Sequence, residues 1–266
     1  MSDNEWQRDF DRAQESKEVN IICMKWGDRY GPEWVNRLYA MMYRNTTWSF
    51  RFVCFTDDET GIRKDVECRP LPEDATGRKN LRKLSILGSE LADLTGMTLF
   101  LDLDVVVMSN VDELFTYEGR FCMMQEWWLD PSSGYGNSSV VRYFIGQESY
   151  VLQRFLDTPA DEIQAQYNSK DQNVMSRMVE NVTFWPRSWC APFNIVCLPK
   201  SRILRFFSSP TPPSDCKILV FYGAITPATA LRGEHEQRKQ SKPGLLRRLV
   251  RRRFGPAHWL ADYWKE

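Results

Sequence analysis

Residues 97–115 read MTLFLDLDVVVMSNVDELF, and this stretch decides the fold that we predict. Its first half is rich in apolar, aromatic and β-branched residues, which is typical of a buried strand. Two acids, Asp102 and Asp104, interrupt the apolar run. Side chains two positions apart in an extended backbone point to the same side, so we expect the two carboxylates to project together while Leu103 faces the core.

A pair of carboxylates inside an apolar run is costly to keep charged without a positive charge beside it. A divalent cation can supply that charge, and Mg²⁺ and Mn²⁺ prefer carboxylate and phosphate oxygens. The pattern therefore indicates Mn²⁺ or Mg²⁺ held by Asp102 and Asp104 together with a nucleotide diphosphate. The alternative is a strand that ends at the surface with two solvated acids, because D-x-D is a common tripeptide.

Composition limits the classes of protein that this chain can belong to. The 266 residues contain no linker rich in Gly, Ser or Pro, which favours one α/β domain. An apolar fraction of 42% and ten Trp supply material for a core and for a groove with flat, stacking walls. The formal net charge is zero, and this argues against nucleic-acid binding, which needs an excess of basic residues.

Charge is uneven at the two ends of the chain. Residues 1–20 carry six acids against three bases, and we read residues 1–18 as a mobile acidic leader or one exposed helix. Residues 231–266 form a basic tail after a domain at 19–230, and its stretch 245–254 (LLRRLVRRRF) has the pattern of a basic amphipathic helix. Such a helix binds an anionic membrane surface or an acidic partner, or it packs back on the domain with its arginines in water.

The seven cysteines include no C-x-x-C pair, and several lie in apolar runs, so we expect reduced, buried thiols. No signal peptide opens the chain, and no apolar run reaches the ~20 residues of a membrane span. We therefore expect a cytoplasmic protein, with peripheral contact to the inner face of the membrane through the tail.

Two further strands are followed by polar loops. The strand at 19–24 runs into Lys25 and Trp26, and the strand at 50–55 runs into Asp57 and Asp58. Ligands of open α/β sheets bind at the carboxyl ends of the strands, so both loops are candidate nucleotide sites, although acid-rich turns also form for their own hydrogen bonding. The remaining elements that we expect are strands at 66–71 and 121–124 and helices at 32–44, 78–94 and 147–156.

The segment FLDLDVVVMSNVDELF resembles the metal-site segment of the GT-A glycosyltransferases, especially glycosyltransferase family 8 and related uncharacterised bacterial glycosyltransferases. Other pieces occur in the same order as in that family: FTDD at 55–58, LRKLSIL at 81–87, NSSV at 137–140, DQ at 171–172 and VFYG at 220–223. The resemblance covers roughly residues 19–225. It implies a GT-A fold, which is a Rossmann-like mixed α/β sheet flanked by helices.

The resemblance also implies an activity, the transfer of a sugar from a nucleotide-diphosphate donor, a UDP-sugar being favoured, to a glycan, lipid-linked or protein acceptor with retention of configuration. It assigns Asp102 and Asp104 to the metal. It places around the donor Lys25, Trp26, Asp57, Asp58, Lys83, Leu103, Asn137, Ser138, Tyr222 and Gly223. Asp171 and Gln172 would face the anomeric carbon, where positive charge develops as the phosphate departs. As an alternative, Asp171 is an acid at a helix N-terminus, where it suits the macrodipole.

One position departs from the family pattern. Tyr222 stands where family 8 enzymes usually place a metal-binding histidine, and a neutral phenol, with its pKa near ~10, is a poor ligand at pH 7. A catalytically silent sugar-nucleotide or membrane-surface binder therefore remains an alternative, as does a nucleotidyl transferase, which also pairs two acids on a metal. The acid Glu126 with Trp127 and Trp128, and the aromatic residues in 184–189, are candidates for an acceptor groove, and the tryptophans are alternatively core residues.

Overall fold

A computed structural model describes residues 3–73, 81–201, 204–236 and 254–266 of the chain. The chain forms two compact units. The first unit consists of Met1–Asn36, Thr46–Leu103 and Asp112–Arg187, and the second of Arg37–Asn45, Asp104–Val111 and Ser188–Glu266. Among the described residues, we find no helix with the length and apolar character needed to cross a membrane.

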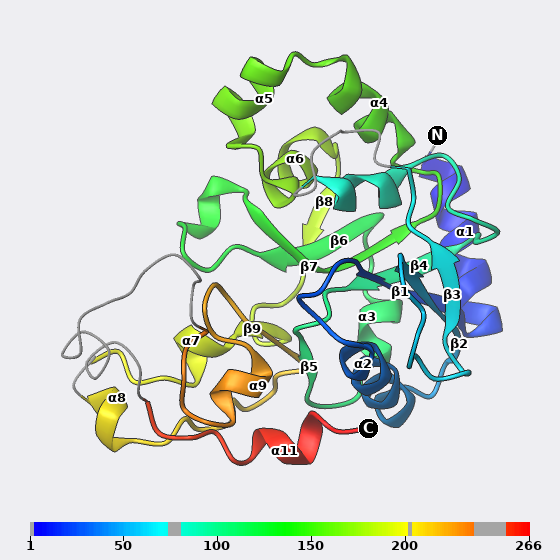
Figure 1. Ribbon diagram of the computed structural model, residues 1–266. Coiled ribbons are helices and arrows are strands. Elements are labelled where there is room, and N and C mark those ends of the chain that lie inside the picture. Colours follow the sequence, from blue (N-terminus) through cyan, green and yellow to red (C-terminus); the bar gives the residue numbers. More distant parts are fainter. Residues whose placement is uncertain (1–2, 74–80, 202–203, 237–253) are drawn as a thin grey trace. The chain divides into compact units, whose positions relative to one another are not determined.

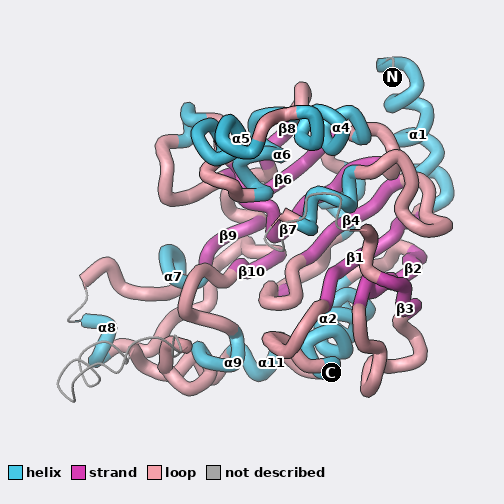
Figure 2. Tube along the Cα trace, turned by 45° about the horizontal axis from the view of Figure 1, so that its top comes forward, coloured by secondary structure: helices cyan, strands magenta, loops and turns pink. Residues whose placement is uncertain are grey.

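The first unit contains a seven-stranded mixed sheet in the order β3-β2-β1-β4-β7-β6-β8. Its strands are β1 (Glu18–Lys25), β2 (Ser49–Thr56), β3 (Glu67–Pro70), β4 (Met97–Leu101), β6 (Phe121–Gln125), β7 (Gly136–Phe144) and β8 (Val182–Phe184). Adjacent strands are parallel except that β7 is antiparallel to both β4 and β6. Figure 2 shows the strands of this sheet in magenta. The carboxyl ends of β1, β2, β4 and β6 therefore meet at one edge of the sheet, and β7 begins at that edge.

Helices cover this sheet. They are α1 (Asp3–Ser16), α3 (Asp112–Thr116), η2 (Pro131–Ser133), α4 (Ser149–Asp157), α5 (Ala160–Tyr167) and α6 (Asp171–Met178), with η1 (Arg82–Leu87) as a 3₁₀ turn. Figure 1 shows α4, α5 and α6 together on one side of the sheet, where they share a buried apolar cluster with the strands and η1. Helix α2 (Pro32–Asn45) begins at the proline, as the sequence predicts, because a missing N–H costs nothing in a first helical turn.

Within the acidic leader, Asp3–Ser16 form helix α1, which is packed on one side and not exposed all round. Phe10 and Ala13 of α1 are buried, and the Gln14 amide donates a hydrogen bond to the Phe115 carbonyl. Phe10 also lies 5.6 Å from the guanidinium carbon of Arg142, a residue of β7 that is fully buried. These contacts attach α1 to the sheet despite its acidic composition, because one side of the helix is apolar.

The second unit is built on a three-stranded sheet in the order β5-β10-β9. Its elements are β5 (Val106–Val107), β9 (Cys190–Pro192), α7 (Phe193–Val196), α8 (Leu204–Phe207), β10 (Ile218–Val220), α9 (Pro227–Ala230) and α11 (Leu260–Tyr263). Within this unit the Arg44 guanidinium donates hydrogen bonds to the carbonyls of Tyr263 and Lys265, and Arg37 stacks on Trp264. The chain's C-terminal residues are thereby anchored. The amphipathic stretch 245–254 lies, except for Phe254, outside the described residues.

The expected helix over 78–94 is wrong. Residues 78–80 lie outside the described residues, and the rest forms η1 followed by turns that include Gly88. Leu81, Leu84 and Leu87 recur every three residues, a spacing that fits a 3₁₀ turn as well as one face of an α-helix. All three are buried, as the sequence predicted. The apolar pattern therefore identified the buried side chains but not the type of helix.

The extended conformation expected at the acidic pair is also wrong. Strand β4 ends at Leu101, and Asp102 and Asp104 lie in the turn that follows. The expected alternation of burial is confirmed nevertheless, since Leu103 and Val105 are buried and the two acids are partly exposed. The strand ends here because the chain leaves the sheet, so the backbone no longer needs to be extended.

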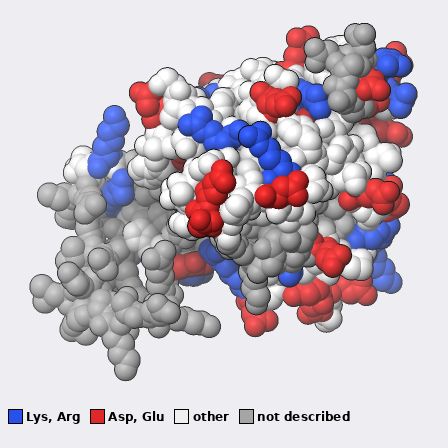
Figure 3. Space-filling model, turned by 90° about the horizontal axis from the view of Figure 1, so that it is seen from above, with Lys and Arg blue, Asp and Glu red and all other residues white. Residues whose placement is uncertain are grey.

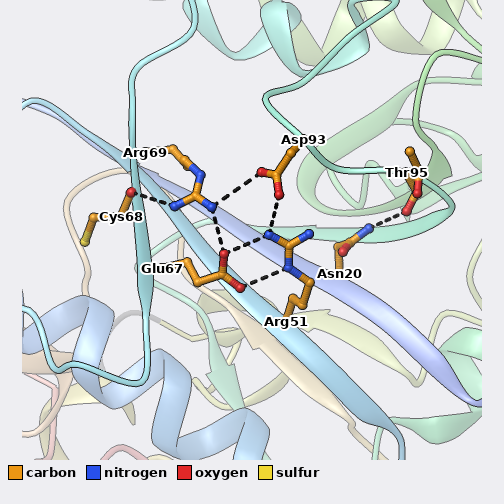
Figure 4. Close-up of polar contacts among 7 residues, drawn as sticks. All are labelled: Asn20, Arg51, Glu67, Cys68, Arg69, Asp93 and Thr95. Atoms are coloured by element: carbon orange, nitrogen blue, oxygen red, sulfur yellow. Dashed lines mark hydrogen bonds and ion pairs between the residues drawn. The ribbon is translucent and has the colours of Figure 1, made fainter.

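Charged side chains on β2, β3 and the segment before β4 form a group that we call the edge cluster, consisting of Arg51, Glu67, Arg69 and Asp93. Arg51 binds both carboxylate oxygens of Glu67, at 2.9 and 2.8 Å, and also contacts Asp93 at 2.9 Å (Figure 4). Arg69 contacts the same two acids at 2.9 and 3.4 Å. Hydrogen bonds from Arg51 hold the pKa values of Glu67 and Asp93 below their ordinary range. Two arginines thus balance two acids.

Acidic and basic side chains are also mixed elsewhere on the surface. Figure 3 shows Lys and Arg side chains lying between those of Asp and Glu on one face of the molecule. This mixture agrees with the zero net charge of the sequence.

Candidate active site

A second charged group, which we call the site cluster, lies at the carboxyl end of β4. It consists of Lys83, Asp102, Ser138 and Asp171. Lys83 is part of η1, and its ammonium lies 2.7 Å from Asp102 Oδ1 and 3.5 Å from Asp171 Oδ2. The side chains of Lys83, Asp102 and Asp171 are 13%, 27% and 19% exposed. Asp102 is held at the end of β4 by its backbone N–H, which donates to the Ser139 carbonyl of β7.

Ser138 connects the lysine to the second acid. Its hydroxyl donates a hydrogen bond to Asp171 Oδ2 at 2.6 Å and lies 3.2 Å from the Lys83 ammonium. The ring of Phe100 on β4 lies 5.0 Å from the same ammonium. One ammonium therefore faces two carboxylates, and these four residues together carry a net negative charge.

Gln172 follows Asp171 in the first turn of α6 and contacts an acid from another strand. Its side-chain amide donates a hydrogen bond to Glu126 Oε2 at 3.1 Å. Glu126 directly follows β6 and is only 9% exposed. The second carboxylate oxygen of Glu126 accepts a hydrogen bond from the Trp128 backbone N–H at 3.2 Å. Both oxygens of this carboxylate are thus engaged.

The loops after β1 and β2 contact each other. The buried Lys25 ammonium donates to the Asp58 carbonyl at 3.1 Å, and Asp57 Oδ2 accepts from the Gly27 backbone N–H at 3.0 Å. The Asp58 carboxylate accepts from the backbone N–H of Thr60, and this hydrogen bond holds the Asp58 pKa below its ordinary value. The Asp58 carboxylate therefore stabilises the turn after β2, whereas the Asp58 carbonyl accepts the hydrogen bond from Lys25.

A hollow of about 410 Å³ lies beside this loop, lined by Thr56, Asp57, Asp58, Glu59, Cys68, Arg69, Pro70 and Leu71. Burial raises the pKa of the Cys68 thiol to about 11, so this cysteine is a neutral side chain at pH 7. The hollow offers hydrogen-bonding groups of both charges, next to residues that the sequence placed on the nucleotide side.

Several residues that the resemblance placed around the donor make contacts within the first unit, and their part in donor binding stays a prediction. Trp26 packs against the apolar cluster of the first unit, and Leu103 is 3% exposed. Asn137 is 6% exposed, and its side-chain oxygen accepts a hydrogen bond from the Ser139 backbone N–H. Within the first unit, the structure therefore brings together Lys83, Asp102, Ser138 and Asp171, and it places Gln172 in contact with Glu126.

Three residues of the expected site belong to the second unit, namely Asp104, Tyr222 and Gly223. Gly223 has a φ of +70°, a left-handed backbone conformation that favours glycine, in the turn after β10. Their part in the site stays a prediction. Among the described residues, no group of three or more His, Cys, Asp and Glu side chains could hold a metal ion.

The sequence places Glu126, with the adjacent Trp127 and Trp128, in a candidate acceptor groove, but it does not predict the contact of Glu126 with Gln172. The signal available for Glu126 is its position directly after a strand whose carboxyl end lies at the site. Ser176 was missed for a different reason. Its hydroxyl donates to the Gln172 carbonyl and accepts from the Gly136 backbone N–H at 2.7 Å, and helix periodicity alone cannot reveal such a contact.

The mixed sheet with its single reversed strand is the sheet of a GT-A fold and confirms the fold that the sequence predicted. Solved structures of similar fold support this assignment. A galactosyltransferase LgtC in complex with donor and acceptor sugar analogs matches with a TM-score of 0.52 and 16% identity, over 78% of this chain and 88% of that one. The glycosyltransferase GlyE of Streptococcus pneumoniae TIGR4 matches with a TM-score of 0.51 and 14% identity, over 88% of this chain and 60% of that one.

An active-site mutant of LgtC matches with a TM-score of 0.50 and 13% identity, over 90% of this chain and 98% of that one. At such identities the likeness establishes the fold. No protein-family model and no curated protein sequence matches this chain.

Proposed function

We propose that this protein is a glycosyltransferase that moves a sugar from a nucleotide-diphosphate donor, a UDP-sugar being favoured, to a saccharide, lipid-linked saccharide or protein acceptor. The observation that carries the proposal is the site cluster at the carboxyl end of β4 in a GT-A fold. There, Lys83 lies between Asp102 and Asp171, and Gln172 follows directly. The solved proteins with this fold include a galactosyltransferase with donor and acceptor sugar analogs, which supports this reaction class.

A divalent cation, Mn²⁺ or Mg²⁺, fits the residues present. Asp102 and Asp104 offer hard carboxylate oxygens, and such ions bind proteins through one or two carboxylates with phosphate oxygens and water as the other ligands. We propose that these two acids hold the ion. When bound, it would neutralise negative charge on the diphosphate as the sugar leaves.

The remaining roles in the proposed transfer fall to residues of the chain itself. The Lys83 ammonium, which already contacts Asp102, would donate hydrogen bonds to the departing diphosphate, since an ammonium carries three donors. The Gln172 side-chain oxygen and the Asp171 carboxylate would face the positive charge that develops at the anomeric carbon. Retention of configuration is proposed on the resemblance to family 8 alone.

A second candidate is a catalytically silent sugar-nucleotide binder. Tyr222 favours it, because a phenol replaces the histidine that the family pattern would supply as a metal ligand. Peripheral membrane contact through residues 245–254 is a separate proposal. It rests on the sequence pattern, because nearly all of this stretch lies outside the described residues.

Calorimetry with UDP in the presence and absence of Mn²⁺ tests the proposal, followed by a screen of sugar nucleotides monitored by UDP release. We expect Mn²⁺-dependent binding and slow donor hydrolysis. Asp104→Asn and Asp102→Asn should each abolish the Mn²⁺-dependent part of binding with an unchanged circular dichroism spectrum. Asp93→Asn is the matched control, because it removes an acid paired with arginine in the edge cluster.

The outcomes separate the candidates. Binding without turnover of any donor supports the silent binder, and transfer of a nucleotidyl group instead of the sugar supports a nucleotidyl transferase. If UDP does not bind, or if Asp104→Asn leaves its Mn²⁺-dependent affinity unchanged, the proposed site is wrong.

A further inference from the structure

We infer that Glu126 is a positioning residue that sets the orientation of the Gln172 side chain in the proposed transfer site. This inference rests on the proposed function. Glu126 follows β6, Gln172 lies in the first turn of α6, and their side chains join at 3.1 Å.

The chemistry of the pair determines which way the amide points. A carboxylate only accepts hydrogen bonds, so the Gln172 NH₂ group must face Glu126 and the amide oxygen must point away from it. No described residue donates a hydrogen bond to that oxygen. Gln172 therefore presents the negative end of its amide dipole, in a defined orientation, to whatever binds beside Asp171.

Glu126 is itself held in place. It is 9% exposed, its backbone N–H donates to the Tyr135 carbonyl at 2.9 Å, and its second carboxylate oxygen accepts from the Trp128 backbone N–H. A side chain with few alternative rotamers is a suitable support for a neighbour whose orientation matters. The same carboxylate thereby links Gln172 to the segment that carries Trp128, a side chain that is 63% exposed.

The first turn of α6 is attached to the sheet at two more points. Ser138 donates to Asp171, and Ser176 joins the Gln172 carbonyl to the Gly136 backbone N–H of β7. These contacts fix the backbone of the turn and do not involve the Gln172 side chain. Among the described residues, Glu126 is the hydrogen-bond partner of that side chain.

The test measures donor hydrolysis with UDP-galactose and UDP-glucose in the presence of Mn²⁺, together with donor affinity by calorimetry. Glu126→Ala should lower kcat by about 10–100-fold while the donor Kd changes less than about twofold, because a misplaced group costs rate and not binding. Glu162→Gln is the matched control, since Glu162 also accepts a hydrogen bond from a glutamine amide, Gln166, but on the exposed surface of α5. This variant should behave as the wild type.

A double variant decides whether Glu126 acts through Gln172. If it does, Glu126→Ala should add less than about twofold to the loss already caused by Gln172→Ala, because residues that act as a unit are not additive. An undiminished loss in the Gln172→Ala background would overturn the inference. So would a Glu126→Ala variant with wild-type kcat.

A measurement of thermal stability, which does not depend on activity, tests this inference separately from the proposed function. Gln172→Glu places two carboxylates side by side and should lower the Tm by about 2–4 °C, whereas adding Glu126→Gln restores the hydrogen bond with its direction reversed and should recover most of that loss. If the wild type hydrolyses no donor, the proposed function fails. The Tm of the double variant then still tests the contact between Glu126 and Gln172. If adding Glu126→Gln does not recover the Tm lost by Gln172→Glu, the inference is wrong.

Discussion

Two charged groups on the same sheet differ in balance and in exposure. The edge cluster pairs two arginines with two acids, and its side chains are 33–59% exposed. The site cluster sets one lysine against two acids, and its charged side chains are only 13–27% exposed. An exposed, balanced cluster needs no further charge, whereas a less exposed cluster with excess negative charge favours binding of a cation.

The geometry of the ion pairs also differs between the edge cluster and the site cluster. Arg51 binds both oxygens of Glu67 in the fork arrangement that suits a permanent ion pair. The Lys83 ammonium is a point charge on a flexible stem, a geometry that allows its contact with Asp102 to be exchanged for one with a phosphate. From this comparison we expect the edge cluster to stabilise the fold and the site cluster to bind a ligand.

The largest expected effect is on turnover. Lys83→Met should lower turnover of the sugar nucleotide by on the order of 10²–10³-fold, because it removes an ammonium that would donate hydrogen bonds to the developing negative charge on the diphosphate. Arg51→Met should leave turnover within about twofold of the wild type. UDP release in parallel assays measures both, and equal losses in the two variants would erase the distinction between the clusters.

A smaller effect is expected on stability. Arg51→Met should lower the Tm by about 1–3 °C, as expected for half-exposed ion pairs worth about 0.5–1 kcal/mol in a chain of this size. Arg63→Met serves as the control, because Arg63 pairs with Asp65 only two residues away and stabilises the fold less. Thermal unfolding followed by circular dichroism measures both. A control that loses as much as Arg51→Met would contradict the role of the edge cluster.

The smallest expected effect is a dependence on pH. Hydrogen bonds from Arg51 lower the pKa of Glu67 in the folded protein, so the stability that this pair contributes is present above the ordinary glutamate pKa of about 4.3 and is lost as the pH falls through the folded value. The Tm difference between wild type and Arg51→Met should therefore be full at pH 6 and shrink below pH 4. A difference that grows at low pH would reverse the sign and refute the assignment.

Much of the fold followed from the pattern of apolar residues. The strands at 19–24, 50–55 and 121–124 lie within β1, β2 and β6, and Pro32 begins α2. The helix over 78–94 failed because residues that repeat every three or four positions fit a helix and a 3₁₀ turn alike, and only packing against the sheet separates the two.

Much of the site cluster was also named in advance, although the contacts within it were not. The sequence and the family resemblance selected Lys83, Asp102, Ser138 and Asp171, and the structure joins them. Neither indicated that the ammonium lies between the two acids. Asp104, the partner expected for Asp102, belongs to the second unit, so the shared metal stays a prediction.

The sequence by itself determined which apolar side chains of the strands are buried, because burial follows local periodicity. Only the tertiary structure decided that Lys83 faces Asp102 and Asp171 and that Glu126 supports Gln172. Those pairings depend on the strand order that brings β4, β6 and β7 together, and distant segments of a chain meet through packing that no local pattern records.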